Sequence, residues 1–255
     1  MIDSDSLEYA QARLQSRHGQ RAGDADWQRL ETAREFTALL DAARNSPLRP
    51  WLVGIAAPST SPQIEAVLRA HWRAAVSEVA GWMPAPWQAA VLWCALWPDL
   101  PVLQHLARGG AAAAWMQDDP ELRALCAVPA AEQAAVVGAG ALAPLAAAWP
   151  APEAMATAWR LEWQRRLPQP LGDAGDSLTL VVATVLKHGA EFATAPPGPG
   201  WLLRRALQAR LSLLLRRAAL EPAAAFIHVA LCALDLERLR GELLGRALFN
   251  RRRQA

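Results

Sequence analysis

The chain has 255 residues, of which 53% are hydrophobic, and its net charge is only +2. This length suffices for one large or two smaller domains with a sizeable core, and the near-neutral charge argues against a nucleic-acid partner. The apolar residues are mostly Ala, Leu and Val, and there are twelve Trp but one Tyr and four Phe. Ala and Leu favour helices over strands, so the composition predicts an all-α fold.

The charge is distributed unevenly along the chain. Residues 1–150 carry 11 basic and 15 acidic side chains, a net charge of −4, whereas residues 151–255 carry 15 basic and 9 acidic ones, a net charge of +6. Lys187 is the only lysine, so nearly all of the positive charge comes from Arg. A GC-rich genome is the explanation we favour for this preference for Arg over Lys. The uneven distribution of charge along the chain separately fits a protein with two unlike faces.

The cysteines and the most apolar segments indicate the compartment. Cys94, Cys126 and Cys232 are widely spaced and lie in apolar runs, which suits buried thiols in a reducing compartment. The first residues are acidic and polar, unlike a signal peptide. Residues 133–149 are the most apolar stretch, but they are short, rich in Ala and interrupted by Pro144, which disfavours a membrane span. We therefore expect a soluble, cytoplasmic protein.

The first third of the chain predicts helices over residues 5–18, 24–45 and 64–79. The last of these is the most regular amphipathic pattern, and Ser61 and Pro62 mark its start as a cap and a first-turn proline. Residues 97–110, WPDLPVLQHLARGG, predict a shorter helix that begins after Asp99 and ends at two glycines.

Further helices are expected over 150–167, 201–220 and 222–251. Residues 177–192 have the Val and Thr content of a strand, whereas their length and surroundings favour a helix. The segment TAPPGPGW (194–201) is the strongest breaker in the chain. We thus expect about a dozen helices in three regions of one compact body: N-terminal units (1–110), a middle region (111–195) and a basic C-terminal unit (196–255).

Motifs of catalysis or ligand binding are weak. GAGALA (138–143) matches G-x-G-x-x-A, but no strand precedes it, so we interpret it as part of a helix or bend. The sequence has no phosphate-binding loop of the Walker type, no H-E-x-x-H and no G-x-S-x-G. The histidines are scattered and fit core or boundary positions: His18, His71, His105, His188 and His228. We predict no catalytic, metal-binding or cofactor-binding residue, no cofactor and no small-molecule substrate.

The C-terminal third carries a basic amphipathic pattern. In residues 201–220 the leucines share one face and the arginines lie largely off it, and the chain ends with three more arginines. The resulting partner-binding candidates are Arg204, Arg205, Arg210, Arg216, Arg217, Arg251, Arg252 and Arg253. Such helices bind acidic proteins, anionic lipids or nucleic acids, but the same pattern also arises on the solvated face of a core helix.

Two segments resemble each other. CALWPDLPVLQHLAR (94–108) and CALDLERLRGELLGR (232–246) share Cys-Ala-Leu, then Asp-Leu-x-x-Leu, and then an Arg. The similarity predicts one helix–turn–helix unit used twice, in which Asp99 and Asp235 cap the second helix through its free N–H groups.

Three elements together resemble the central-stalk adaptor family of V/A-type rotary ATPases, which has members in archaeal-type and in eukaryotic enzymes. The elements are YAQARLQSR followed by DADWQRLE, then PDLPVLQHLAR, then ALDLERLRGELLGRALF. The residues that match are Tyr9, Ala12, Arg13, Trp27, Leu30, Asp99, Leu100, Leu103, Leu106, Arg108, Asp235, Leu239 and Arg240. Val102 departs from the family's Asn, the chain is shorter than typical members, and residues 111–200 show little that aligns.

The resemblance implies a non-catalytic, peripheral role at the cytoplasmic face of a membrane. Members of that family are all-helical and funnel-shaped, with three repeated helical units around a pseudo-threefold axis. They link the rotor stalk subunits to the membrane proteolipid ring of a proton- or sodium-translocating ATPase. The resemblance makes Tyr9, Arg13, Asp99, Arg108, Asp235 and Arg240 structural positions of the repeated units.

Two alternatives remain open from the sequence. One is a cytosolic helical interaction or regulatory protein that docks through its basic C-terminal region, and the other is an enzyme on an all-α scaffold. The sequence leaves open the coupling ion, the direction of ATP chemistry, the oligomeric state, the surface that each partner contacts, and whether a third repeat lies in 111–200.

Overall fold

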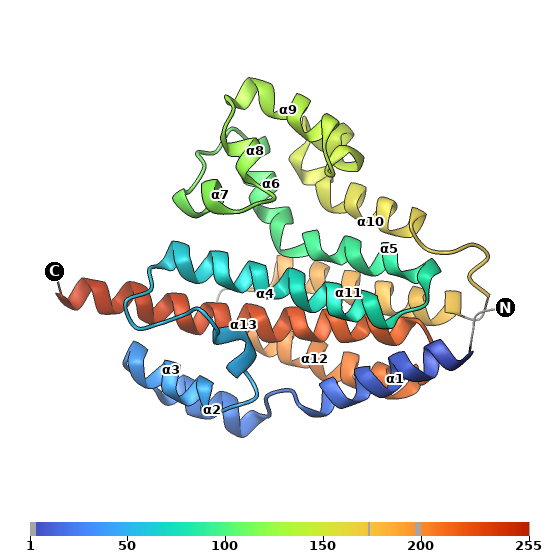
Figure 1. Ribbon diagram of the computed structural model, residues 1–255, viewed down its shortest axis with the longest axis horizontal. Coiled ribbons are helices and arrows are strands. Elements are labelled where there is room, and N and C mark those ends of the chain that lie inside the picture. The colour runs from blue at the N-terminus through green and yellow to red at the C-terminus, as the bar shows by residue number, and fades with distance from the viewer. Residues whose placement is uncertain (1–3, 173, 197–199, 255) are drawn as a thin grey trace. The chain divides into compact units, whose positions relative to one another are not determined.

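The computed structural model describes residues 4–172, 174–196 and 200–254. In these residues the chain forms thirteen α-helices and four short 3₁₀ helices, η1–η4, and no β-strand (Figure 1). The all-α prediction is confirmed. No helix among these residues is both long enough and apolar enough to cross a membrane.

The chain folds into two compact units, each assembled from three separate stretches. Unit 1 contains Met1–Arg21, Ala75–Leu92 and Leu167–Arg238. Unit 2 contains Ala22–Ala74, Trp93–Arg166 and Leu239–Ala255. The two longest helices, α4 (Ser61–Trp82) and α13 (Ala223–Gln254), contribute residues to both units.

Unit 1 contains the second part of α4, the first part of α13 and four further helices: α1 (Ser4–Gly19), α5 (Ala85–Trp93, without its last residue), α11 (Ala174–Thr194) and α12 (Gly200–Arg217). Its core is aliphatic and aromatic. Ala10 and Leu14 lie four residues apart on α1 and are both buried, as the helical period requires. The rings of Trp87 and Phe226 lie 6.4 Å apart and join α5 to α13.

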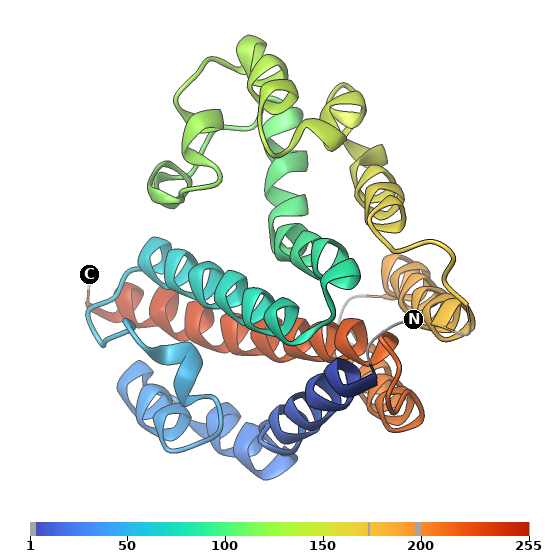
Figure 2. The same cartoon turned by 45° about the vertical axis from the view of Figure 1, so that its right-hand side comes forward.

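Helix α11 settles an ambiguity of the sequence, because its Val and Thr residues could also have formed a strand. Leu178, Val181 and Thr184 are buried at a spacing of three residues, which fits a helix and not the two-residue period of a strand. The Thr184 hydroxyl donates to the Leu180 carbonyl oxygen at 2.8 Å, so the helix satisfies it internally. Helix α11 packs on α12, in the yellow and orange part of the chain (Figure 2).

Unit 2 is built mostly from short helices together with the first part of α4 and the last part of α13. The elements are α2 (Asp24–Thr32), α3 (Phe36–Arg44), η1 (Arg49–Leu52), η2 (Cys94–Asp99), α6 (Leu100–Ala107), α7 (Ala114–Asp118), α8 (Arg123–Cys126), α9 (Ala130–Ala139), η3 (Ala143–Ala148), η4 (Pro152–Ala154) and α10 (Met155–Arg165). Helices α9 and α10 both pack on η3. GAGALA (138–143) covers the last two residues of α9, the following Gly140 and the first residue of η3, so it is part of a helix and a bend, as interpreted from the sequence.

Three tryptophans of unit 2 hold α10 against the end of α5 and η2. The indole Nε1 of Trp93 donates to the Trp159 carbonyl oxygen at 3.0 Å, and the indole Nε1 of Trp159 donates to the Trp93 carbonyl oxygen at 3.2 Å. The rings of Trp97 and Trp159 stack with centroids 5.8 Å apart. We call these residues the Trp93–Trp97–Trp159 clasp.

The start of α4 differs by one residue from the predicted cap. The backbone N–H of Gln63 donates to the Thr60 hydroxyl at 3.3 Å, and the Thr60 N–H donates to the Gln63 side-chain oxygen at 2.8 Å. This reciprocal pair is a capping box, so Thr60 and not Ser61 supplies the cap. Pro62 follows in the first turn, as predicted.

The segment 97–110 forms η2 and α6 and ends at its glycines as predicted. Gly109 has φ of +77°, a conformation that only glycine adopts without strain. The N–H groups of Gly109 and Gly110 return to the carbonyl oxygens of Leu106 and His105 at 2.8 and 3.0 Å. The two glycines thus close the last turn of α6.

The predicted capping role of Asp99 and Asp235 is wrong. Asp99 precedes α6, but its side chain makes no capping hydrogen bond, because it bonds to arginines instead. Asp235 lies in the interior of α13, which runs without a break from residue 223 to residue 254. The two similar segments therefore have different backbones: the first is a 3₁₀ helix followed by an α-helix, and the second is a single α-helix.

Candidate docking site

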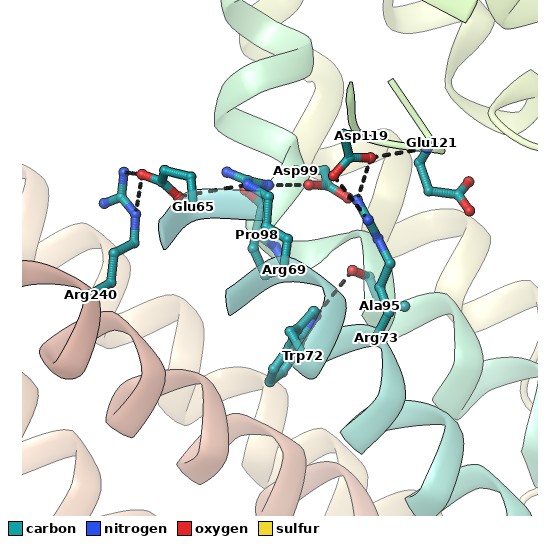
Figure 3. Close-up of polar contacts among 10 residues, drawn as sticks. All are labelled: Glu65, Arg69, Trp72, Arg73, Ala95, Pro98, Asp99, Asp119, Glu121 and Arg240. Carbon is teal, nitrogen blue, oxygen red and sulfur yellow. Dashed lines mark hydrogen bonds and ion pairs between the residues drawn. The ribbon is translucent and has the colours of Figure 1, made fainter. Parts of the chain in front are cut away.

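A cluster of charged side chains surrounds Asp99 in unit 2 (Figure 3). The Asp99 carboxylate is 2% exposed and bonds to the guanidinium groups of Arg69 and Arg73, which lie one turn apart on α4. Arg69 Nη1 also donates to the Pro98 carbonyl oxygen at 3.1 Å, and Arg73 Nη2 lies 3.2 Å from Asp99 Oδ2. The cluster thereby ties η2 to α4.

The cluster continues to Asp119, after α7. Arg73 donates to both oxygens of the Asp119 carboxylate at 2.9 Å, and that carboxylate also accepts the Glu121 N–H at 2.9 Å. Although burial disfavours the charged form of Arg73, its hydrogen bond to Asp119 and the charges of Asp99 and Asp119 raise its pKa. The bidentate geometry orders the irregular turn that leads to α8.

At the other end, the cluster reaches Glu65 and Arg240. Glu65 lies one turn before Arg69 on α4, with 3.8 Å between its carboxylate and Arg69 Nε, and it accepts the Arg240 Nε–H at 2.7 Å. Arg240 lies on α13, so α4 and α13 are joined here within unit 2 (Figure 3). Asp99 and Arg240, which occupy different parts of the two similar segments, therefore belong to one network.

The aspartate of the second segment is buried in the same manner in unit 1. Asp235 is 5% exposed, and Arg21 donates to its two oxygens at 2.7 and 2.8 Å. Burial raises the pKa of Asp235, and the Arg21 hydrogen bond opposes that rise. Burial raises the pKa of Asp99 as well, against the charges of Arg69 and Arg73. The Asp99 and Asp235 carboxylates are both bonded to arginines, and these bonds join segments that are distant in the sequence.

The remaining predicted structural positions lie at the surface. Tyr9 is 55% exposed, and Arg13 lies 5.2 Å above the Trp82 ring and 4.0 Å from the Glu78 carboxylate. Arg108 is exposed at the C-terminal end of α6, where its charge is favourable to the helix dipole. The YAQAR element therefore contributes one exposed aromatic residue and one arginine anchored on α4.

The candidate arginines of α12 divide into two groups. Arg204 donates to both oxygens of the Glu237 carboxylate and lies 4.3 Å from the Phe192 ring, so it is engaged inside unit 1. The others are exposed: Arg205, Arg210, Arg216 and Arg217. Arg251, Arg252 and Arg253 fall in the last turns of α13, and their side chains lie outside the described residues.

One pair has the spacing of a nucleophile and a base. Cys232 Sγ lies 3.5 Å from His228 Nε2, one turn away on α13. Burial raises the pKa of the Cys232 thiol to about 12 and lowers the pKa of the His228 imidazole to about 3. At neutral pH the imidazole is a very weak base and the thiol is protonated, so this pair is a packing contact.

Among the residues that the structure describes, no group of three or more His, Cys, Asp or Glu side chains is placed to hold a metal ion. Comparisons of the chain with protein-family models, curated proteins and solved structures found no match. The candidate site is therefore described by its own residues: two buried acid–arginine clusters and an exposed basic face on α12.

The arginines that bond the buried carboxylates were not predicted from the sequence: Arg21, Arg69 and Arg73. For Arg69 a signal was present, because it falls beside Trp72 and Val76 at the edge of the buried arc of α4. An arginine at that position requires a buried acid, since an unpaired buried charge is costly. For Arg21, which is distant from Asp235 in the sequence, no local signal existed.

Proposed function

We propose that the protein is a non-catalytic helical adaptor, and that its partners are the rotor stalk subunits and the membrane proteolipid ring of a V/A-type rotary ATPase. The observation that carries the adaptor role is the division of the charged side chains. The acids that the sequence singled out, Asp99 and Asp235, bond arginines and join helices. Four of the five arginines of α12 are exposed instead: Arg205, Arg210, Arg216 and Arg217. Stiff helices and an exposed charged face suit recognition of a partner by shape and charge.

The rotary-motor assignment rests on the resemblance of the three sequence elements. Its structural positions include Asp99 and Arg240, which lie in one network, and Arg13, which is anchored on Trp82 and Glu78. The matched positions thus include residues with definite internal contacts.

The test is direct binding. The purified chain is mixed with the purified stalk and proteolipid-ring subunits of the V/A-type ATPase from the same organism, and complexes are separated by size-exclusion chromatography. A stoichiometric complex is expected with at least one of the two. Elution of the chain at its own position in both mixtures contradicts the rotary role.

A helical interaction or regulatory protein without a rotary role is the second candidate. The exposed basic face of α12 favours it, because that face can serve any acidic partner. Gene order separates the two candidates: ATPase head, stalk and proteolipid genes beside this gene favour the rotary role, and their absence favours the second candidate.

A further inference from the structure

Helix α12 carries two apolar stripes on opposite faces. Leu207, Leu211, Leu214 and Leu215 point into unit 1 and are at most 8% exposed. The second stripe consists of Leu202, Ala206, Ala209 and Leu213, and all four residues are exposed. Leu202 and Leu213 expose 64% and 46% of their surface. We call this second set the outer stripe.

The outer stripe has the spacing of a coiled-coil seam. Its residues follow one another at intervals of four, three and four, which is the alternation of a and d positions in a heptad repeat. In heptad terms they occupy the a and d positions, and the buried leucines occupy b, c and f. A helix that needed to cover only its own unit would require one apolar stripe, and α12 has two.

Arginines line both edges of the outer stripe. Arg205 occupies a g position, and Arg210 and Arg217 occupy e positions, which are the places where coiled-coil partners exchange ion pairs. Arg216 continues the stripe at its C-terminal end. In the part of the chain that the structure describes, no carboxylate forms an ion pair with Arg210, Arg216 or Arg217. The outer stripe is therefore apolar and has arginines along both edges, and the arginines at its e positions form no ion pair in the described residues.

We propose that the outer stripe of α12 binds an amphipathic helix of a partner protein, with apolar residues at heptad spacing and Glu or Asp at its flanking positions. Charge complementarity selects this occupant, because the partner's acids would meet Arg210 and Arg217 along one edge of the seam. A second copy of the same stripe would place arginine against arginine.

The small residues in the middle of the stripe favour a helix over a lipid surface. Ala206 and Ala209 allow another helix backbone to approach closely, whereas burial of two methyl groups in lipid gains little free energy. The opposite face of α12 is buried in unit 1, so the helix is also not free to sink into a bilayer. This inference deepens the proposed adaptor role and rests on it for the nature of the partner.

The test uses a synthetic peptide of about three heptads, with Leu at its seam positions and Glu at its flanking positions. A control peptide has Lys in place of each Glu. Binding to the full chain is measured by fluorescence anisotropy at low ionic strength and again at higher salt. We expect the Glu peptide to bind at least about tenfold more tightly than the Lys peptide, with an advantage that shrinks in salt.

Variants of the chain locate the binding surface. The double variant Arg210→Glu/Arg217→Glu is expected to lose about tenfold in affinity for the Glu peptide and to gain affinity for the Lys peptide. The matched control is Arg34→Glu/Arg123→Glu, which changes the net charge equally at exposed arginines outside α12. Leu213→Asp tests the apolar part, and Leu186→Asp, on the exposed face of α11, is its control. Both controls are expected to bind like the parent.

Four results of the binding measurements overturn the proposal. The first three are absence of Glu-peptide binding, equal binding of both peptides, and equal effects of the test and control variants. The fourth is that the chain binds phosphatidylserine-containing vesicles more strongly than the peptide and that Leu213→Asp abolishes this vesicle binding. Self-association of the chain that Leu213→Asp abolishes would likewise assign the stripe to a second copy.

The same variants separate this inference from the proposed function. If the parent chain and Arg210→Glu/Arg217→Glu bind the stalk and ring subunits equally, the adaptor role stands and the outer stripe is not its docking face. If neither subunit binds but the peptide results hold, the docking face stands and the rotary role is wrong.

Discussion

Asp99 shows why a buried carboxylate in this protein depends on its arginines. The carboxylate is 2% exposed and bonds to Arg69 and Arg73, whose side chains are 9% and 19% exposed. If the carboxylate is removed, two guanidinium groups lose a counter-charge in a place where water reaches them poorly. Arg73 keeps its bonds to Asp119, and Arg69 keeps its contact with Glu65 at 3.8 Å. The loss still exceeds the net value of the pair, because the Arg69 charge remains buried.

We therefore predict that Asp99→Asn lowers the free energy of unfolding by about 3 kcal/mol, as measured by urea denaturation at neutral pH. The control is Asp118→Asn, at an exposed aspartate that adjoins the same cluster in sequence. It is expected to change stability by less than about 0.5 kcal/mol. Equal effects of the two substitutions would refute the structural role of the Asp99 cluster.

The stability of the folded chain depends on pH through His228. Burial lowers its pKa from 6.5 to about 3, and the positive charges of Arg21, His18 and Arg17 act in the same direction. Below pH 6.5 the His228 side chain therefore binds a proton in the unfolded chain but not in the folded chain. The stabilisation is complete above pH 6.5 and is lost as the pH falls towards 3, at about 1.4 kcal/mol per pH unit.

Between pH 7 and pH 5 this group alone should lower the free energy of unfolding by about 2 kcal/mol. His228→Gln and His228→Leu are both expected to remove that part of the slope, as measured by urea denaturation across the range. Above pH 7 the difference between each variant and the parent should stay constant, which serves as the control. An unchanged slope in both variants would contradict the assignment to His228.

At the scale of elements, the Trp93–Trp97–Trp159 clasp holds α10 through two indole hydrogen bonds and one stacked pair. Trp159→Ala removes one of those donors and the stacking partner of Trp97 together. We expect a loss of about 2 kcal/mol in urea denaturation. Leu161→Ala, two residues along α10 and 56% exposed, should cost little. Equal losses would show that the clasp does not stabilise α10.

The end of α6 depends on a single glycine. Because Gly109 has φ of +77°, a Cβ there is strained whatever space surrounds it. Gly109→Ala is expected to lower stability by about 1 kcal/mol in the same assay. Gly138→Ala in α9, where nothing lies within 4 Å of the added Cβ, should be neutral or stabilising. The reverse order would contradict the assigned turn.

Sequence patterns predicted the elements better than the contacts between them. The amphipathic period located α4, and the glycines located the end of α6, because both signals are local. The role of Asp99 was predicted wrongly. A capping bond needs only the neighbouring N–H groups, whereas the bonds that Asp99 makes come from arginines of α4. The capping role of Asp235 was predicted wrongly because α13 continues through this residue, and its partner, Arg21, lies in a distant part of the chain. Only the tertiary fold brings such pairs together.

At the scale of the whole molecule, each unit combines distant stretches of the chain. Unit 1 joins the N-terminal helix to α12 and the first part of α13, and unit 2 joins α2 and α3 to the last part of α13. In unit 2, Arg246 on α13 donates to the Ala33 carbonyl oxygen at 3.0 Å and to the Glu31 carbonyl oxygen at 3.0 Å. Stability within each unit thus depends on contacts between residues far apart in sequence.

The proposed adaptor role is a statement about assembly, so its most direct test is composition in the cell. The full chain, tagged and expressed in its own organism at its natural level, is isolated from detergent-solubilised membranes, and the co-purifying proteins are quantified by mass spectrometry. The account predicts rotor stalk and proteolipid-ring subunits of a V/A-type ATPase in fixed stoichiometry with the chain. Recovery of the chain without them, from membranes in which that ATPase is intact, would contradict it.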